Sequence, residues 1–334
     1  MNCFSTRRDF IKYFTSLGIF FISIFRFTIS FAQAGRSQKS NPRPGRVVIV
    51  RHTEAVSGNG SVSSEAVKQM LSQGIVKLTE IADVRKAWLS IFSSNETIGI
   101  KVNALGGNRI CTHPEIAYAV AEHLIAAGIK PCQVIIWDRL TAELEKAGFT
   151  IQKGGSRIQC FGTDSDYEAE PETSGSIGSC FSRILSRLCD AIISIPVLKD
   201  HDLSGVSINL KNFYGAIHNP NKYHDNGCDP YIADLNSHPY IKNKLRLVIC
   251  DGLVAQYNGG PAYKPQWSWP YGGLLFSQDP VAVDQVGCQI IEEQRKIKGL
   301  PALEESGRPP RHIQTAAQRN LGTADLQKIE KIII

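Results

Sequence analysis

TIGIKVNALGGNRICTHPEIAYAVAEHLIAAGIKPCQVIIW, residues 97–137, contains two short apolar runs separated by an amphipathic stretch. The apolar runs at 97–102 and 133–137 predict strands buried on both faces, and residues 113–127 predict a helix between them. Thr112 and Glu115 have the spacing of a capping box at the start of this helix, and Gly128 is placed to end it. A strand, a helix and a second strand in this order predict a parallel sheet.

The same alternation continues along the rest of the chain, and no internal repeat is visible. Further strands are predicted at residues 46–50, 191–198, 245–250 and 273–277, and further helices at 64–73, 140–147, 232–244 and 280–297. Residues 154–179 are rich in Gly, Ser, Asp and Glu, which predicts a long surface excursion. The fold class is therefore α/β, a mainly parallel sheet with helices on both faces, in a single large domain over residues 46–334.

The first 34 residues have the pattern of an export signal. Arg7 and Arg8 resemble a twin-arginine motif, an apolar stretch follows at 13–31, and Ala34 ends a small-residue cleavage pattern. Residues 35–45 are basic and rich in Pro and Gly, as expected of a flexible linker. We expect a periplasmic protein whose partner is the twin-arginine translocation machinery. The alternative is a retained membrane tether, which Arg26 within the apolar stretch disfavours.

Composition excludes some classes of function. The net charge of +6 comes partly from the leader, so the remaining domain is too mildly basic to predict nucleic-acid binding. Nine cysteines are present, none in a CxxC pair, which argues against an iron–sulfur cluster or a zinc knuckle. We expect at most one or two disulfides in an exported protein of this kind.

Polar residues follow the predicted strands, where ligands of open parallel sheets bind. Asn103, Asp138 and Asp251 each lie at the end of a strand, and half of such residues are expected only to cap helices or to bond loops. The loop containing Gly106 would let backbone N–H groups approach an anion, although a simple tight turn is the favoured interpretation.

The densest polar region is residues 199–234. Lys199 and Lys211 are candidate clamps for a carboxylate or phosphate, and His201 is a candidate general acid or base. A divalent metal is the sharper alternative, with His218, His224 and Asp234 as ligands.

DPVAVD, residues 279–284, has two interpretations. Asp279 is expected to cap a helix with Pro280 in its first turn, and the alternative places Asp279 or Asp284 in the cleft.

Seven short segments together resemble the domain-of-unknown-function family 362. These are IKVNALGG (100–107), THPE (112–115), LKDH (198–201), NLKNFYG (209–215), DLN (234–236), CDG (250–252) and DPVAVD (279–284). The resemblance covers nearly the whole domain and implies no activity. It marks the following positions as site or scaffold residues: Asn103, Lys199, His201, Lys211, Asn212, Gly215, Asp251, Asp279 and Asp284. Some relatives look like iron–sulfur proteins, and this chain departs from them because it lacks their cysteine spacing.

The sequence is compatible with three functions. The first is an exported enzyme acting on a small anionic substrate, assisted by a metal where one binds, with Asn103, Gly106, Asn212, Asp251, Asp279 and Asp284 as the substrate-binding set. The second is a periplasmic ligand-binding or accessory protein without catalysis, which the absence of two similar lobes disfavours. The third, an iron–sulfur redox partner, is the least favoured.

Overall fold

The computed structural model describes residues 45–57 and 60–334, with the side chain of Asn108 left out. The predicted leader, with Arg7, Arg8 and Ala34, and all but the last residue of the predicted linker lie outside the described residues. None of the described helices has the length and apolar character of a membrane-spanning segment.

Within the described residues the central sheet has eleven strands, and its main path runs β13-β1-β12-β10-β7-β2-β3-β4. Its members are β1 (Arg46–Arg51), β2 (Ile98–Val102), β3 (Val134–Asp138), β4 (Gln159–Gly162), β7 (Ala191–Ile195), β10 (Leu245–Gln256), β12 (Gly273–Ser277) and β13 (Glu330–Ile333). Neighbours from β4 to β10 pair in parallel, as do β1 and β13, while β12 is antiparallel to both of its neighbours. The mainly parallel α/β fold predicted from the sequence is confirmed.

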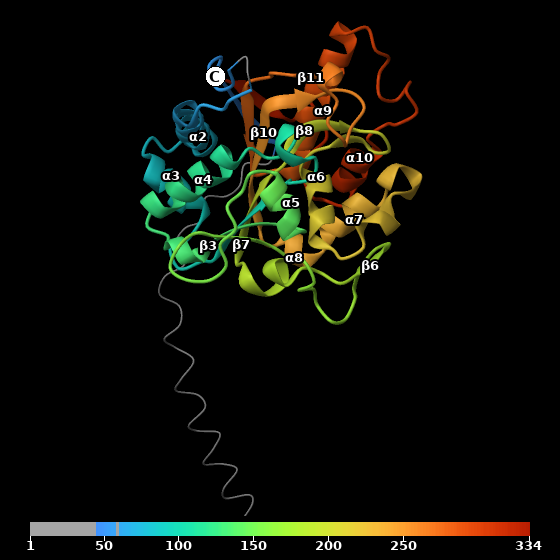
Figure 1. Cartoon of the computed structure of the whole chain (residues 1–334). Coiled ribbons are helices and arrows are strands. Elements are labelled where there is room, and N and C mark those ends of the chain that lie inside the picture. Colours follow the sequence, from blue (N-terminus) through green and yellow to red (C-terminus); the bar gives the residue numbers. More distant parts are fainter. Residues whose placement is uncertain (1–44, 58–59) are drawn as a thin grey trace, which may run out of the picture. The chain divides into compact units, whose positions relative to one another are not determined.

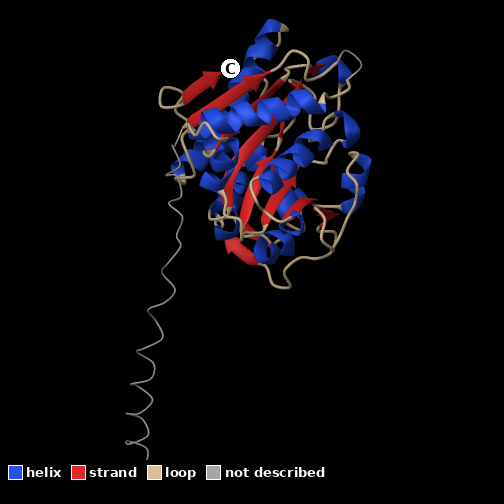
Figure 2. Cartoon of the chain, turned by 90° about the vertical axis from the view of Figure 1, so that its left-hand side faces the viewer, coloured by secondary structure: helices blue, strands red, loops and turns tan. Residues whose placement is uncertain are grey.

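Helices cover both faces of this sheet (Figures 1 and 2). Alternate residues of each strand point to opposite faces, so Val47 and Ile49 join one buried cluster while Val48 and Val50 join the other. One face packs against α2 (Ser64–Thr79), α3 (Val84–Ile91) and α4 (Pro114–Ala126), with α5 (Thr141–Lys146) at its edge. The other packs against α6 (Asn209–Asn212), α7 (Tyr231–Ser237), α8 (Pro239–Lys242), α9 (Pro280–Ile297) and α10 (Arg311–Gln318).

Shorter strands extend the central sheet. β8 (Val197–His201) pairs with β9 (Gly205–Ser207) and with β10, and β11 (Ser268–Trp269) pairs with β10. A separate hairpin joins β5 (Glu172–Ser174) to β6 (Ile177–Ser179). Residues 154–179 are thus only partly the surface excursion that we predicted, because β4 within them is an edge strand of the main sheet.

The capping box predicted before α4 is wrong. The N-cap residue is His113, one position later, and Thr112 is turned inward to link two strands. Its Oγ1 accepts from Asn103 N (2.8 Å) and donates to Ile195 O (2.6 Å), so the hydroxyl joins the ends of β2 and β7 instead of capping the helix. Gly128 does follow the helix with a φ of 108°, as predicted.

All eight cysteines in the described part of the chain are free thiols. Cys250 has no exposed surface, whereas Cys132 is partly exposed. Desolvation by burial raises the pKa of Cys111, Cys160 and Cys189 to about 12, so these thiols stay protonated and pack as small apolar groups.

Candidate functional site

The order in which the chain adds strands to the sheet reverses between β2 and β7. From β2 the chain proceeds to β3 and β4 on one side, and then returns to β7 and β10 on the other. The carboxyl ends of two such diverging parallel strands leave a crevice where α/β proteins bind ligands. The fold therefore places a candidate site beyond residues 102 and 195.

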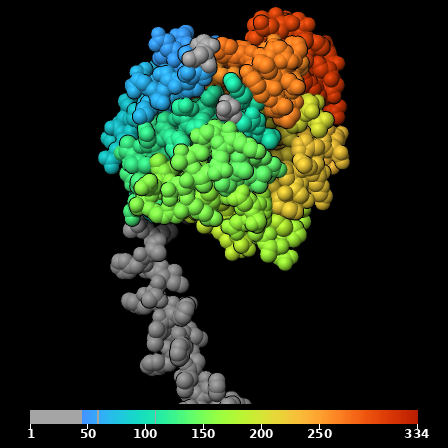
Figure 3. Space-filling model, in the orientation of Figure 1, coloured from blue at the N-terminus to red at the C-terminus, as the bar shows by residue number. Residues whose placement is uncertain are grey.

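A cleft of about 240 Å³ lies at this place. Its polar lining comes from segments far apart in the sequence: Lys101, Asn103, Asp138, Arg139, Glu143, His201, Ser207, Lys211, Asn212, Tyr214, Asn221 and His224. In the space-filling view, the surface of the earlier segments, coloured green, adjoins the gold and orange surface of the later ones (Figure 3). Seven of the residues singled out from the sequence meet here, namely Asn103, Asp138, His201, Lys211, Asn212, Gly215 and His224.

A buried ion pair forms the floor of the cleft. Lys101 Nζ lies 2.6 Å from Asp138 Oδ1 and also donates to Val102 O (2.7 Å). The Asp138 carboxylate accepts in addition from the backbone N–H groups of Ala104 (2.6 Å) and Arg139 (2.7 Å). The two charges of the pair compensate each other within the protein. The pair therefore forms a rigid floor beneath the cleft that carries no net charge.

Gly215 shows how closely the chain approaches that pair. A Cβ atom at this position would lie 2.6 Å from Asp138 Oδ1 and 2.8 Å from Lys101 Nζ, which is closer than real Cβ contacts allow. Gly215 was predicted as a site or scaffold position, and steric fit against the ion pair is the reason that the structure supplies.

Lys211 carries the uncompensated charge of the cleft. Its side chain is buried, yet no carboxylate of the described residues lies within ion-pairing distance of its Nζ. Nζ donates to His224 Nε2 (3.1 Å) and lies 4.0 Å from the centre of the Tyr214 ring. Desolvation by burial lowers the pKa of Lys211 to about 8, so the amine is mostly protonated at neutral pH but close to titration.

The position of Lys211 depends on Asp284. The Asp284 carboxylate on α9 accepts from the N–H groups of Asn209 (2.8 Å) and Leu210 (3.0 Å), which open the four-residue helix α6. Burial raises the pKa of Asp284 to about 8, although the two N–H donors favour its charged form. Asp284 thus orients the helix that presents Lys211 and Asn212, and it does not line the cleft.

The two histidines of the cleft are neutral. His224 Nδ1 lies 3.1 Å from Pro220 O, a contact that needs a proton on Nδ1 and leaves Nε2 to accept from Lys211. His201 is assigned the opposite tautomer, because two backbone N–H groups, of Leu203 (3.1 Å) and Ser204 (3.4 Å), donate to its Nδ1, and the exposed Asp202 Oδ1 lies 3.1 Å from the same nitrogen. Burial, with the nearby Lys211 as the next cause, lowers the pKa of His201 to about 2. His201 is therefore a hydrogen-bond donor through Nε2–H and a poor general base at neutral pH, which revises its predicted role.

Lys199 lies behind the cleft and does not line it. Its Nζ donates to Asn103 Oδ1 (3.0 Å), Leu105 O (3.1 Å) and Ile110 O (3.1 Å), which uses all three donors of the ammonium. The loop around Gly106 (φ 114°) thus points carbonyl oxygens at a lysine. The tight-turn interpretation of this loop fits the structure better than anion binding by its N–H groups, and Lys199 orients Asn103 instead of clamping a ligand.

Two further predicted residues have structural partners. Asp251 accepts from His113 N (2.8 Å) and Nδ1 (2.7 Å) at the start of α4. Asp279 caps α9, as predicted, by accepting from Val281 N and Ala282 N, and its second oxygen accepts from Gly45 N and Thr323 N. Neither lines the cleft.

The three predicted metal ligands lie in separate surroundings. Asp234 pairs with Arg319 (2.8 Å) and accepts from Ser176, and His218 lines a second hollow beside Tyr167. Only His224 lines the cleft. The described residues contain no cluster of three His, Cys, Asp or Glu side chains able to hold a metal ion. A divalent metal stays a prediction for which these residues supply no common site.

Sequence reasoning missed Lys101, which it treated as part of an apolar strand. A single lysine within TIGIKV was the available signal, because a charge in a strand buried on both faces needs a partner. It also missed the roles of Tyr214 and Ser207 in the lining.

The family model of domain of unknown function 362 (DUF362) matches residues 98–289. The chain belongs to the DUF362 family. The matched region runs from β2 into α9 and contains the whole lining of the cleft. Membership brings no activity with it, since none is attached to the family's description. No curated protein matches the chain.

One solved structure that the chain is similar to is a protein from Thermotoga maritima, determined by a structural genomics consortium. The two share 13% sequence identity with a TM-score of 0.44, and the match covers 70% of this chain and 59% of the other. The DUF362 chain therefore spans less than two thirds of that protein, and a likeness at this level carries no functional argument.

Proposed function

We propose that the cleft binds a small anionic molecule and that this DUF362 protein is an enzyme acting on it. The observation that carries the proposal is Lys211, a buried ammonium without a carboxylate within ion-pairing distance among the described residues. Buried charges are normally paired, so a carboxylate or phosphate in the cleft would supply the missing counter-charge. His201 Nε2–H lines the same cleft and would donate a second hydrogen bond to that anion.

The lowered pKa of Lys211 supports catalysis beyond binding. A group whose pKa is about 8 can both hold and release a proton near neutral pH, which is the property of an efficient general acid. In this proposal the Lys211 ammonium first binds the anion and then donates its proton to a leaving or carbonyl oxygen, with the neutral His224 as its hydrogen-bonding partner.

We expect Lys211→Met to weaken the binding of inorganic phosphate and succinate by about 10- to 150-fold, because one charge-assisted hydrogen bond contributes about 1.5–3 kcal/mol. Isothermal titration at pH 7 measures this effect. Lys244→Met is the matched control, since Lys244 is also a partly buried lysine that donates only to backbone carbonyls, of Leu185 and Ser186, and lies outside the cleft. Equal affinities of the two variants for both probes would refute the proposal.

A ligand-binding protein without catalysis is the second candidate. The low pKa of His201 favours it, because this histidine is then not an effective base at neutral pH. A bound ligand recovered chemically unchanged after long incubation with the protein, as followed by NMR of the solution, would favour this function over the enzyme.

We further propose that residues 1–34 export the folded domain through the twin-arginine pathway. This rests on the adjacent Arg7 and Arg8 and on the apolar stretch after them. Changing both arginines to lysine is expected to keep the protein inside the cell at its uncleaved mass, whereas Lys12→Arg leaves export unchanged. Cell fractionation with mass spectrometry checks both, and export of the double variant at the normal level would contradict the assignment.

A further inference from the structure

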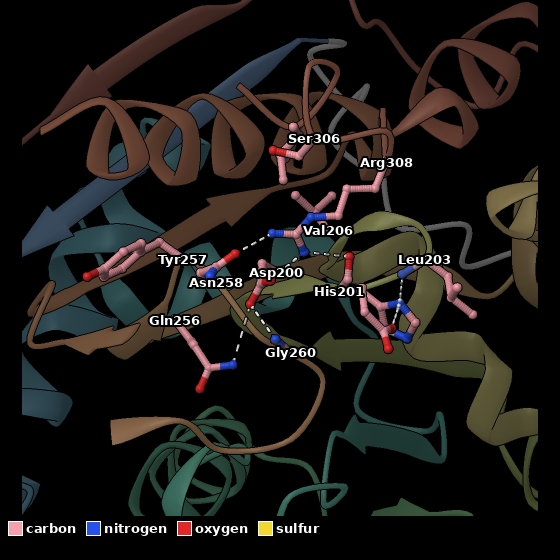
Figure 4. Close-up of polar contacts among 12 residues, drawn as sticks. Asp200, His201, Leu203, Val206, Gln256, Tyr257, Asn258, Gly260, Ser306 and Arg308 are labelled. Carbon is pink, nitrogen blue, oxygen red and sulfur yellow. Dashed lines mark hydrogen bonds and ion pairs between the residues drawn. The ribbon is translucent and has the colours of Figure 1, made fainter. Parts of the chain in front are cut away.

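His201, one of the two histidines of the cleft, lies at the end of β8, and this end is bonded to a residue far along the chain. Arg308 Nη1 donates to the backbone carbonyl of His201 (3.1 Å) and to Asp200 Oδ2 (2.7 Å) (Figure 4). Arg308 follows α9 and lies beyond residues 98–289, which the family model matches. The backbone on both sides of the His201 side chain is thus held from outside the matched region.

Asp200 makes this attachment strong. Its carboxylate has no exposed surface, and Arg308 is its charged partner. Gly260 N (2.9 Å) and Gln256 Nε2 (3.4 Å) donate to its other oxygen. Removing the arginine would leave a buried carboxylate with neutral partners only, so the end of β8 would have to move toward water.

The second arm of the guanidinium reaches the loop after β10. Arg308 Nη2 donates to Asn258 Oδ1 (2.6 Å), and Arg295 Nη1 donates to the same oxygen (3.0 Å). This loop continues to Gly260, which contacts Asp200, and to Pro261, which lines the cleft. One planar guanidinium therefore connects the segment of His201 with the segment of Pro261, which also lines the cleft, as a lysine with its single ammonium could not.

We propose that Arg308 is a positioning residue, which holds His201 and Pro261 at the separation that the anion-binding cleft requires. The inference rests on the proposed function of the cleft, and it assigns a role in ligand binding to a residue that contacts no ligand. His201 Nε2–H has no hydrogen-bond partner among the described residues, so its direction depends on the backbone that Arg308 holds and on the contacts at Nδ1, which are the N–H groups of Leu203 and Ser204 and the Oδ1 atom of Asp202 (3.1 Å).

The test compares Arg308→Gln with Arg246→Gln. Arg246 is the matched control, because it also pairs with a carboxylate, of Glu96 (2.7 Å), and donates to a backbone carbonyl, of Ile91 (3.3 Å), but it lies outside the cleft. Both variants are expected to be less stable than the wild type. Only Arg308→Gln should weaken phosphate binding, by about tenfold, and shift the ring ¹⁵N signals of His201 in long-range ¹H–¹⁵N NMR spectra, where His201→Gln assigns those signals.

The two readouts separate the possible failures. Unchanged His201 signals in Arg308→Gln, or an equal change in Arg246→Gln, would overturn the positioning role. If the wild type binds neither phosphate nor succinate, the proposed function of the cleft fails, while the ring signals still decide whether Arg308 positions His201. Should Arg308→Gln not fold, Arg308→Lys is the variant to use. It keeps a positive charge beside Asp200 and loses the hydrogen bond to Asn258 Oδ1. Wild-type ring signals and affinity in Arg308→Lys would equally overturn the proposal.

Discussion

Asp138→Asn is expected to lower the free energy of unfolding by about 3–5 kcal/mol, because it leaves the Lys101 ammonium buried without a counter-charge. Lys101 is 1% exposed and Asp138 4%, so water cannot replace the lost partner. The carboxylate also accepts from Ala104 N and Arg139 N, and asparagine can keep only part of this set. Equilibrium denaturation in urea measures the loss.

The double variant Lys101→Met/Asp138→Asn separates charge from packing. Removing both charges should recover at least half of the stability that Asp138→Asn loses, since no unpaired ion is left in the interior. Glu96→Gln is the comparison for a less buried pair, because Arg246 and Glu96 are 18% and 16% exposed and their pair is expected to contribute no more than about 1 kcal/mol. If Asp138→Asn lowered the free energy of unfolding no more than Glu96→Gln does, the interpretation of Lys101 and Asp138 as a buried ion pair that stabilises the floor of the cleft would be wrong.

The parts of the fold that sequence predicts are those where burial leaves a simple pattern. Strands such as VVIV in β1 and VIIW in β3 are apolar at every position because helices cover both faces of the sheet. β8 extends through Lys199, Asp200 and His201, which are as buried as its apolar residues. An apolar pattern ends before these three, so it cannot predict the strand that carries the site.

The sequence predicts which residues meet at the candidate site better than it predicts what each residue does there. Asn103, His201, Lys211 and Asn212 were expected to meet, and they line one cleft. Asp251, Asp279 and Asp284 have the same residue type and similar positions after strands or at a helix, yet each is used to hold backbone N–H groups. Which use a carboxylate has depends on the direction of its side chain, and that direction is set by contacts between segments far apart in the sequence.

The stability conferred by Lys211 is expected to change with pH in the direction opposite to its affinity for anions. Its pKa is about 8 in the folded protein and ordinarily 10.5, so between these values the unfolded chain binds more protons than the folded one. Stability must therefore rise with pH across this window, and the free energy of unfolding of the wild type relative to Lys211→Met should grow by about 3 kcal/mol from pH 8 to pH 10.5. Urea denaturation of both proteins in buffers free of phosphate and carboxylate measures this difference.

Anion affinity should fall over the same range, by up to tenfold per pH unit above about pH 8, because only the ammonium form pairs with the anion. Lys199, whose pKa burial also lowers to about 8, is present in both proteins, so the main part of its contribution, which comes from burial, cancels in the comparison. Lys68→Met is the control, since the ion pair of Lys68 with Glu122 raises its pKa and predicts no gain in stability below pH 10.5. A single titration that strengthens folding while it weakens binding can come only from a buried amine that faces the ligand. If the two properties changed at different pH values, Lys211 would not be the group that holds the anion.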